Sequence, residues 1–409
     1  MSVTAPPRPP RPSDRVGREE IEALVEALIE EARKRAQRRR RRNAVVVTLV
    51  ALVGGALFAM LGRSAQSQTA SPALAARSSL SAVTGESKIA FIREPAGGYA
   101  GVLWVMNPDG SGQRSLGPAF PDTDWSPDGQ KIAFTTWGDR RPSGGGDIYV
   151  TNADGSGRER LTTNAGPDSD PAWSPDGRKI AFVSGRDGNS GIYVMNADGT
   201  QQRLLMRAKV SYPPQLAWSP DGRKLAFTVA LTSGPDGNLE IYVMNADGSG
   251  LRNLTRSTVR DSYPVWSPDG RRIAFESNWQ VNVMNADGSP GQRRLTHNGG
   301  RNFNPAWSPD GQRIAFEHRR RQGTSHWVGA WGYKVYVMNA DGSGQQRLTH
   351  GGSQPRWSPD GRKIAFVSKR DGYADIYVMN ANGSGQRNLT RTPGADRRES
   401  QPVWSPAQS

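Results

Sequence analysis

Cysteine is absent from the 409-residue sequence, which excludes a disulfide framework and any metal site built on thiolates. Histidine is scarce: the chain has four, and none of them stand at the His-x-x-x-His spacing of a helical zinc site. A Gly-x-Ser-x-Gly motif, which presents the nucleophile of α/β-hydrolases, is also missing. From these absences we expect no catalytic metal, no cofactor and no serine-hydrolase domain.

Charged residues are absent from one run of nineteen residues, 44–62. In a helix this run extends about 28 Å, close to the ~30 Å hydrocarbon core of a bilayer. Eight Lys and Arg residues lie within positions 33–42, and the positive-inside rule places them in the cytoplasm. We therefore predict a single-pass cell-membrane protein with a transmembrane helix at 44–62, a cytoplasmic N-terminus and an extracytoplasmic remainder. The alternative is a signal peptide cleaved near Ala73-Leu74-Ala75, but the basic segment is too long for one.

The predicted cytoplasmic segment, 1–43, is basic, with a disordered Pro- and Arg-rich start followed by a helix at 18–42. One face of this helix carries apolar residues at the i, i+3, i+4 spacing, namely Ile21, Leu24, Val25, Leu28, Ile29 and Ala32. Such a face suits a cytoplasmic partner or self-pairing, and a merely solvated helix is the alternative. Residues 63–86 are rich in Ser and Ala and are predicted to be a flexible linker.

The formal net charge is +15, a value that by itself suggests nucleic acid. Residues 1–43 hold twelve Lys and Arg against seven Asp and Glu, and thus contribute +5. The basic run 38–42 within them is better explained as a topology signal. The other charges are spread as single residues along the chain, and a basic balance alone is a weak signal. We expect no nucleic-acid partner.

The rest of the chain is organised around a repeat of Trp-Ser-Pro-Asp-Gly. Complete copies stand at 125–129, 173–177, 218–222, 266–270, 307–311 and 357–361, and Trp404-Ser405-Pro406 begins a seventh. Successive tryptophans are 48, 45, 48, 41, 50 and 47 residues apart. A period in the forties indicates one supersecondary unit repeated many times.

Each repeat contains four short segments with strand character. A strand ending in Trp leads through the Ser-Pro-Asp-Gly turn into a Lys/Arg-Ile/Leu-Ala-Phe strand, with copies at 88–91, 131–134, 179–182, 224–227, 272–275, 313–316 and 363–366. A third strand resembling Ile-Tyr-Val-Met-Asn runs into an Ala-Asp-Gly-Ser-Gly turn, and a short Arg/Asn-Leu-Thr strand follows. The turn resembles half of a calcium loop, but it lacks the closing Glu, so we interpret it as a hairpin turn.

Four antiparallel strands per period are typical of a propeller blade. The first Lys-Ile-Ala-Phe, at 88–91, has no Trp strand before it, and the last Trp strand, 401–404, has no partner after it. Residues 88–118 and 400–406 together complete one blade, which leaves no open edge in the ring. We predict an all-β, seven-bladed β-propeller over residues 87–409, closed by this split blade and preceded by the cytoplasmic and transmembrane helices.

These motifs resemble the WD-like repeats of the TolB-type β-propeller family over residues 87–409. TolB itself is a periplasmic six-bladed propeller with an additional amino-terminal domain, and it binds an envelope lipoprotein at the mouth of its channel. This chain differs in its seven predicted blades, its membrane anchor and its lack of a counterpart to that domain. The resemblance implies a noncatalytic binding or scaffold module for an envelope protein, peptide or glycan, without identifying the partner.

An enzymatic alternative stays open, because propellers also carry active sites. Acid pairs precede two of the Trp strands, Asp122 with Asp124 and Asp168 with Asp170. A hydrolase or lyase could use such a pair at the channel mouth, whereas the simpler interpretation is that they are solvated loop acids.

A binding surface is predicted where the repeats differ, because folding explains the residues that recur. The longest insertion, 319–334, combines arginine with aromatic residues and has no acid. Its candidate binding residues are Arg319, Arg320, Arg321, His326, Trp327, Trp331 and Tyr333. Strand order places Tyr263 and Phe303 near the same mouth. The alternative is that the aromatic residues of the insertion pack on a neighbouring blade.

Overall fold

The computed structural model describes residues 87–95, 101–136, 146–188, 190–207, 215–230, 238–320, 332–391 and 397–407. The predicted cytoplasmic helix (18–42), transmembrane helix (44–62) and linker (63–86) lie outside these residues. Among the residues that are described, no helix is long and apolar enough to cross a membrane. The described chain is built from β-strands joined by turns.

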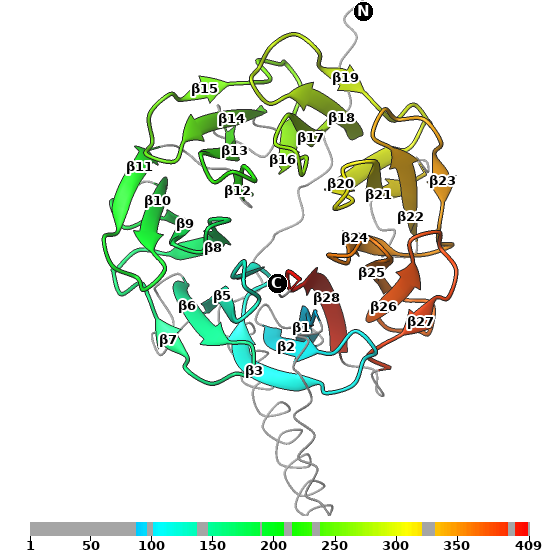
Figure 1. The fold of residues 1–409 in the computed structure, drawn as a ribbon, viewed down its shortest axis with the longest axis horizontal. Helices are drawn as coiled ribbons and strands as arrows, with labels where there is room; N and C mark the ends of the chain where they lie inside the picture. Colours follow the sequence, from blue (N-terminus) through cyan, green and yellow to red (C-terminus); the bar gives the residue numbers. More distant parts are fainter. Residues whose placement is uncertain are drawn as a thin grey trace, which may run out of the picture. The chain divides into compact units, whose positions relative to one another are not determined.

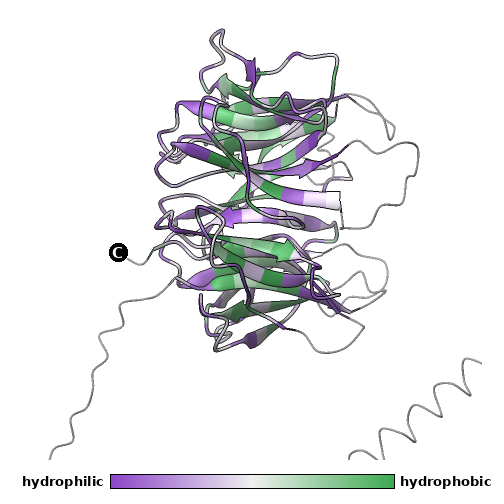
Figure 2. Cartoon of the chain, turned by 90° about the vertical axis from the view of Figure 1, so that its right-hand side faces the viewer, coloured by the Kyte–Doolittle hydropathy of each residue, from purple (hydrophilic) through white to green (hydrophobic). Residues whose placement is uncertain are grey.

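Seven four-stranded antiparallel sheets, counted over the described residues, stand around a common centre (Figure 1). This arrangement confirms the predicted seven-bladed propeller. In each blade the strand that ends in Trp is innermost, and its three partners follow outward in chain order. Figure 2 shows hydrophobic segments within the strands and mostly hydrophilic turns between them.

The innermost strands are β4 (Thr123–Trp125), β8 (Asp168–Trp173), β12 (Ala217–Trp218), β16 (Asp261–Trp266), β20 (Arg301–Trp307), β24 (Ser353–Trp357) and β28 (Arg397–Trp404). The second strands are β1 (Ile89–Pro95), β5 (Lys131–Thr136), β9 (Lys179–Ser184), β13 (Lys224–Ala230), β17 (Arg272–Ser277), β21 (Arg313–Arg319) and β25 (Lys363–Ser368).

The third strands are β2 (Gly101–Met106), β6 (Asp147–Asn152), β10 (Gly191–Asn196), β14 (Leu239–Asn245), β18 (Gln280–Asn285), β22 (Tyr333–Asn339) and β26 (Asp375–Asn380). The outermost strands are β3 (Arg114–Ala119), β7 (Glu159–Arg160), β11 (Arg203–Arg207), β15 (Arg252–Asn253), β19 (Arg293–Arg294), β23 (Gln346–Arg347) and β27 (Arg387–Asn388). Five of these outermost strands are only two residues long.

The split blade closes the ring as predicted. Strand β28 pairs antiparallel with β1, so that Trp404 stands opposite Ile89. Beyond this ladder, the Lys88 amide donates to the Ser405 hydroxyl at 2.8 Å, and the Ser405 amide donates to the Lys88 carbonyl at 2.8 Å. Segments more than 300 residues apart therefore share one sheet, and the inner edge of β1 is paired rather than open.

The Trp-Ser-Pro-Asp-Gly turn is held by bonds within the motif. In the β4–β5 turn the Ser126 hydroxyl donates to Asp128 at 2.6 Å and accepts from the Lys131 amide at 2.8 Å. Gly129 closes the turn at φ 67°, a left-handed value that favours glycine. The same serine bonds recur in the other five complete copies, which explains why the whole motif repeats.

The Ala-Asp-Gly-Ser-Gly segments are also hairpin turns. Asp154 accepts from the Ser156 amide at 2.9 Å, while Asn152 donates to the Ser156 hydroxyl at 2.9 Å. Hydrogen bonds from the Ser156 hydroxyl and from the Ser156 amide hold the pKa of Asp154 below its usual value. The oxygen atoms that resembled calcium ligands are therefore used within the turn.

The core lies between the blades and depends on the alternation in Lys-Ile-Ala-Phe. Ile132 and Phe134 face the preceding blade, where they pack with Ala90. Ala133 points the other way and packs with Phe182 of the following blade. All seven phenylalanines at this position are fully buried. A large side chain on one face and alanine on the other lets adjacent blades pack closely.

The repeated tryptophans join each blade to the one before it. Their indole N–H groups donate to backbone carbonyls of the preceding inner strand in six cases, namely Trp125 to Val403, Trp218 to Ala172, Trp266 to Ala217, Trp307 to Val265, Trp357 to Ala306 and Trp404 to Arg356. Trp173 is different, because its buried indole nitrogen has no hydrogen-bond partner among the described residues.

This difference between the tryptophans gives a test of their role. Trp357→Phe removes the 3.1 Å bond to Ala306 and leaves a buried carbonyl without this donor. We expect it to lower the free energy of unfolding by about 1–3 kcal/mol in urea denaturation. Trp173→Phe is the matched control and is expected to cost less, because it removes a donor that has no partner. Equal losses for the two variants would show that the hydrogen bond does not stabilise the ring.

Candidate functional site

The inner strands line a central channel, and in six of the seven described blades the backbone turns left-handed three residues before the tryptophan. Six residues at this position have positive φ angles of 47–58°, namely Asp170, Gln215, Tyr263, Asn304, Gln354 and Gln401. Register shifts mark the same point in most of these strands. Left-handed backbone at non-glycine residues is strained, and such strain is commonly found at binding sites. Asp122 holds the equivalent position directly before β4.

These channel residues also connect neighbouring blades through their backbone amides. Asp122 accepts from the Asp170 amide at 2.9 Å, and Gln354 accepts from the Gln401 amide at 2.6 Å. Gln215 accepts from the Tyr263 amide in the same way, at 2.7 Å. An acceptor on one blade thus fixes the strained turn of the next, and the side chains stay at the channel wall.

The channel encloses a cavity of about 600 Å³ with acids on one side. Burial and the nearby carboxylate of Asp170 raise the pKa of Asp122 to about 7. Burial raises the pKa of Asp170 and of Asp124 to about 6 each. Asp124 accepts from the Trp173 amide at 2.7 Å.

The structure therefore groups these acids differently from the two pairs predicted from the sequence, Asp122 with Asp124 and Asp168 with Asp170. Asp122 and Asp170 meet across two blades, whereas the fully buried Asp168 turns to Asn164 and Arg186. The alternative interpretation as solvated loop acids is wrong for these residues, because all four lie within or beside strands and are at least partly buried.

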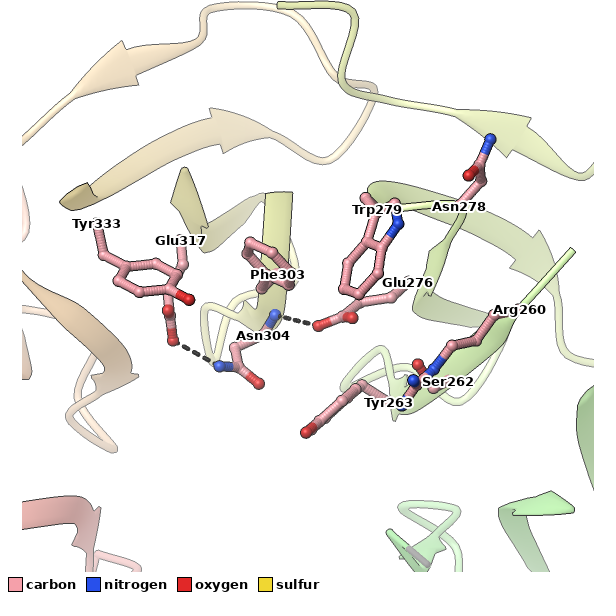
Figure 3. A pocket seen from close by; sticks show the side chains of 10 residues that line it. All are labelled: Arg260, Ser262, Tyr263, Glu276, Asn278, Trp279, Phe303, Asn304, Glu317 and Tyr333. Atoms are coloured by element: carbon pink, nitrogen blue, oxygen red, sulfur yellow. Dashed lines mark hydrogen bonds between the residues drawn. The ribbon is translucent and has the colours of Figure 1, made fainter. Parts of the chain in front are cut away.

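A second cavity, of about 300 Å³, lies between the β16–β19 and β20–β23 blades (Figure 3). We call it the aromatic–carboxylate pocket, and its lining residues are Arg260, Ser262, Tyr263, Glu276, Asn278, Trp279, Phe303, Asn304, Glu317 and Tyr333. Three of its rings lie in a row. Trp279 and Phe303 meet edge-on with centroids 5.5 Å apart, and Phe303 meets Tyr333 likewise at 5.9 Å.

Two nearly buried carboxyl groups accompany these rings. The residues Glu276 and Glu317 are 6% and 3% exposed. Asn304 joins them, because its amide donates to Glu276 at 2.7 Å and its side chain donates to Glu317 at 2.5 Å (Figure 3). Burial raises the pKa of Glu276 to about 8 and also raises the pKa of Glu317. Both acids thus occupy an environment that disfavours their negative charge.

The predicted binding residues are only partly brought together. Tyr263, Phe303 and Tyr333 all line the aromatic–carboxylate pocket. The guanidinium of Arg319 lies over the Tyr333 ring at 5.5 Å, and Arg320 is exposed beside it. The remaining candidates, Arg321, His326, Trp327 and Trp331, lie outside the described residues.

Trp279, Glu276 and Glu317 also line the pocket but were not among the residues predicted from the sequence. A signal for Trp279 was present, because the 41-residue spacing is the shortest and leaves a two-residue turn, Asn278-Trp279, between β17 and β18. Both turn residues have positive φ angles, 45° and 63°, and Trp279 is 40% exposed. The two glutamates follow Ala-Phe in only two repeats, a departure that the repeat pattern could have revealed.

The fold and these cavities define a seven-bladed β-propeller with a polar channel and an adjoining pocket of aromatic and acidic residues. The chain belongs to the TolB β-propeller domain family, whose model matches residues 117–217, 210–329 and 329–409. A comparison with curated protein sequences gave no match.

Solved structures with the same fold have diverse names. TolB from Acinetobacter baumannii is 22% identical with a TM-score of 0.50, over 83% of this chain and 89% of that chain. An oligogalacturonate lyase from Vibrio parahaemolyticus is 16% identical with a TM-score of 0.52, over 75% and 87%. The propeller domain of the Trilobed protease from Pyrococcus furiosus is 13% identical with a TM-score of 0.55, over 76% and 96%. These similarities establish the fold alone.

Proposed function

We propose that this protein is a membrane-anchored, extracytoplasmic propeller that binds an envelope protein, peptide or glycan without catalysis. The observation that carries the proposal is the row of Trp279, Phe303 and Tyr333 at a cavity between two blades. Aromatic residues beside arginine are the side chains that contribute most to binding at protein interfaces. Here, Arg301 lies over Trp279 at 4.6 Å and Arg319 lies over Tyr333.

The exposure of Trp279 supports an interface at this pocket. Among the described residues, large hydrophobic side chains are rarely exposed, and Trp279 is one of three that are. It sits on a tight turn of two residues, and its contacts with Phe303 and Arg301 hold the ring in place before a ligand arrives. Preorganised aromatic side chains lose little conformational entropy on binding, which favours affinity.

A capture experiment with the full-length chain, solubilised from membranes, tests this function. We expect the wild type to retain an envelope component and the Trp279→Ala/Phe303→Ala variant to retain at least tenfold less. Leu251→Ala is the matched control, because Leu251 is 50% exposed but lies beside the Ala-Asp-Gly-Ser-Gly turn before β15, outside the pocket. Equal capture by all three proteins would contradict binding at this pocket.

A carboxylate-based hydrolase or lyase is the second candidate, and one observation favours it. Asp122 and Asp170 lie next to each other at the channel, with pKa values raised to about 7 and 6. Acids with such values can exchange protons near neutral pH, as general acid–base catalysis requires. If the protein is such an enzyme, it should turn over a substrate, and the Asp122→Asn variant should lose that turnover. Binding at the aromatic–carboxylate pocket should persist in the same variant.

A further inference from the structure

We propose that the aromatic–carboxylate pocket receives one cationic side chain, a lysine or an arginine, from a bound protein segment. This inference rests on the proposed binding function and specifies the chemical group that enters the pocket. It stands on the two buried carboxyl groups, on the rings beside them and on the size of the cavity.

The carboxyl groups are placed to receive a cation. Glu276 uses Oε1 for the Asn304 amide, and Glu317 uses Oε1 for Asn304 and for the Gln354 amide at 2.8 Å. Within the described part of the chain, the Oε2 atoms of both glutamates accept no hydrogen bond, although both side chains line the cavity (Figure 3). Two acceptor atoms are thus left for donors that a ligand would bring.

The two glutamates of the pocket differ in the cations that lie near them. The half-buried guanidinium of Arg356 acts on Glu317 and lowers the pKa of that acid against the effect of burial. Among the described residues, the exposed Arg260 is the cation whose charge lowers the pKa of Glu276, while Glu317 raises that pKa by repulsion. A buried acid without a buried counter-charge is costly, and a ligand cation would offset that cost.

The rings around the carboxyl groups suit the same ligand. Aromatic faces attract ammonium and guanidinium groups, and two rings of this pocket already lie under guanidinium groups of the chain. The volume of about 300 Å³ is at the small end of ligand pockets, so it suits one side chain rather than a folded segment. An uncharged sugar would use the rings but would leave the two acids uncompensated.

The test uses the full-length chain and small amides that represent single side chains. Ligand-observed NMR would measure the binding of N-acetyl-lysine methylamide and N-acetyl-arginine methylamide, with the norleucine and glutamate analogues as uncharged and acidic controls. We expect at least one basic probe to bind tenfold more tightly than norleucine. The Glu276→Gln/Glu317→Gln variant is expected to lose at least tenfold of that affinity. Glu240→Gln, at a buried glutamate outside the pocket, is the matched control and should bind as the wild type does.

The pH dependence provides a readout that a purely structural role would not change. Binding of a cation requires Glu276 to give up its proton, so lowering the pH from 8.5 to 6.5 should weaken binding at least tenfold. Among the described residues, the other titratable or charged groups that line the pocket are Arg260, Tyr263, Glu317 and Tyr333, and Arg356 acts on Glu317 from beside it. Of these, Glu317 acts in the same direction, since burial raises its pKa too. In the Glu276→Gln variant, the affinity for the basic probe should change much less with pH.

Several outcomes would overturn the inference. Equal or tighter binding of the norleucine or glutamate probe would show that the pocket does not select a cation, and so would unchanged affinity in the double glutamine variant. In the capture experiment, a partner lost by Trp279→Ala/Phe303→Ala but kept by the double glutamine variant would leave the binding function intact and refute the cationic group. Loss of the partner in both variants supports the inference.

Discussion

Phe316→Ala is expected to lower the free energy of unfolding by about 3–5 kcal/mol, the usual cost of removing a fully buried phenylalanine. Phe316 is 0% exposed and lies in one cluster with Ala274 and Val283 of the preceding blade and with Trp307 of its own. The substitution opens a cavity between two blades, where the backbone of a closed ring has little freedom to collapse. Urea denaturation followed by tryptophan fluorescence measures the loss.

Phe303→Ala in the same blade is the matched control. Phe303 is only partly buried and faces the aromatic–carboxylate pocket rather than the core. Its truncation is expected to cost less than about 1.5 kcal/mol, since removing it opens no closed cavity. If the two variants lost equal stability, the separation between a folding core and a binding pocket would be wrong.

Raising the pH from about 5 to about 8 is expected to lower the free energy of unfolding of the wild type by about 6 kcal/mol. In the folded chain burial raises the pKa of Glu276 to about 8 and that of Asp122 to about 7, the latter with help from Asp170. In the unfolded chain such acids lose their protons near pH 4. Between these values the folded state binds protons that the unfolded state has released, so stability falls by at most ~1.4 kcal/mol per pH unit for each group.

Other titratable groups change how steeply the free energy of unfolding falls with pH, but they do not reverse its direction. Asp124 and Asp170, with pKa values of about 6, add to the loss between pH 5 and 6. His318 acts in the opposite direction, because burial lowers its pKa below 6.5 and the unfolded state then binds the extra proton. The aspartates of the hairpin turns have lowered pKa values, such as that of Asp154, and therefore titrate below this range.

The Glu276→Gln variant tests the group expected to contribute most to the pH dependence of stability. The amide oxygen of glutamine can still accept from the Asn304 amide, but it has no proton to lose. The variant is expected to show a flatter pH profile than the wild type above pH 6 and greater stability at pH 8. Denaturation midpoints at pH 5, 6.5 and 8 measure both. A wild-type profile that rises from pH 5 to 8 would contradict the buried, protonated state of these acids.

The repeat and its blades could be predicted from sequence because their determinants are local. The Ser126 hydroxyl, Asp128 and Lys131 lie within six residues, so a short motif contains every partner of the turn. The alternation of Ile132, Ala133 and Phe134 likewise defines two packing faces in one strand. Counting these units gave seven blades and the split closure, since an unpaired first strand and an unpaired last strand require each other.

The candidate site could be predicted only in part. Tyr263, Phe303 and Tyr333 were found because they depart from the repeat near one mouth. Glu276 and Glu317 depart from the repeat at the position after Ala-Phe, but this departure alone does not show that the two side chains are neighbours. Nothing in the local sequence indicates that both carboxyl groups share Asn304.

The sequence by itself determined the seven-bladed, all-β fold, because turn chemistry and strand alternation act over a few neighbouring residues. The tertiary structure alone decided which side chains meet. The bond from the Asp170 amide to Asp122 spans 48 residues, and the one from the Asn304 amide to Glu276 spans 28. Contacts of this kind depend on how the closed ring positions adjacent blades, and that positioning results from packing summed over the whole propeller.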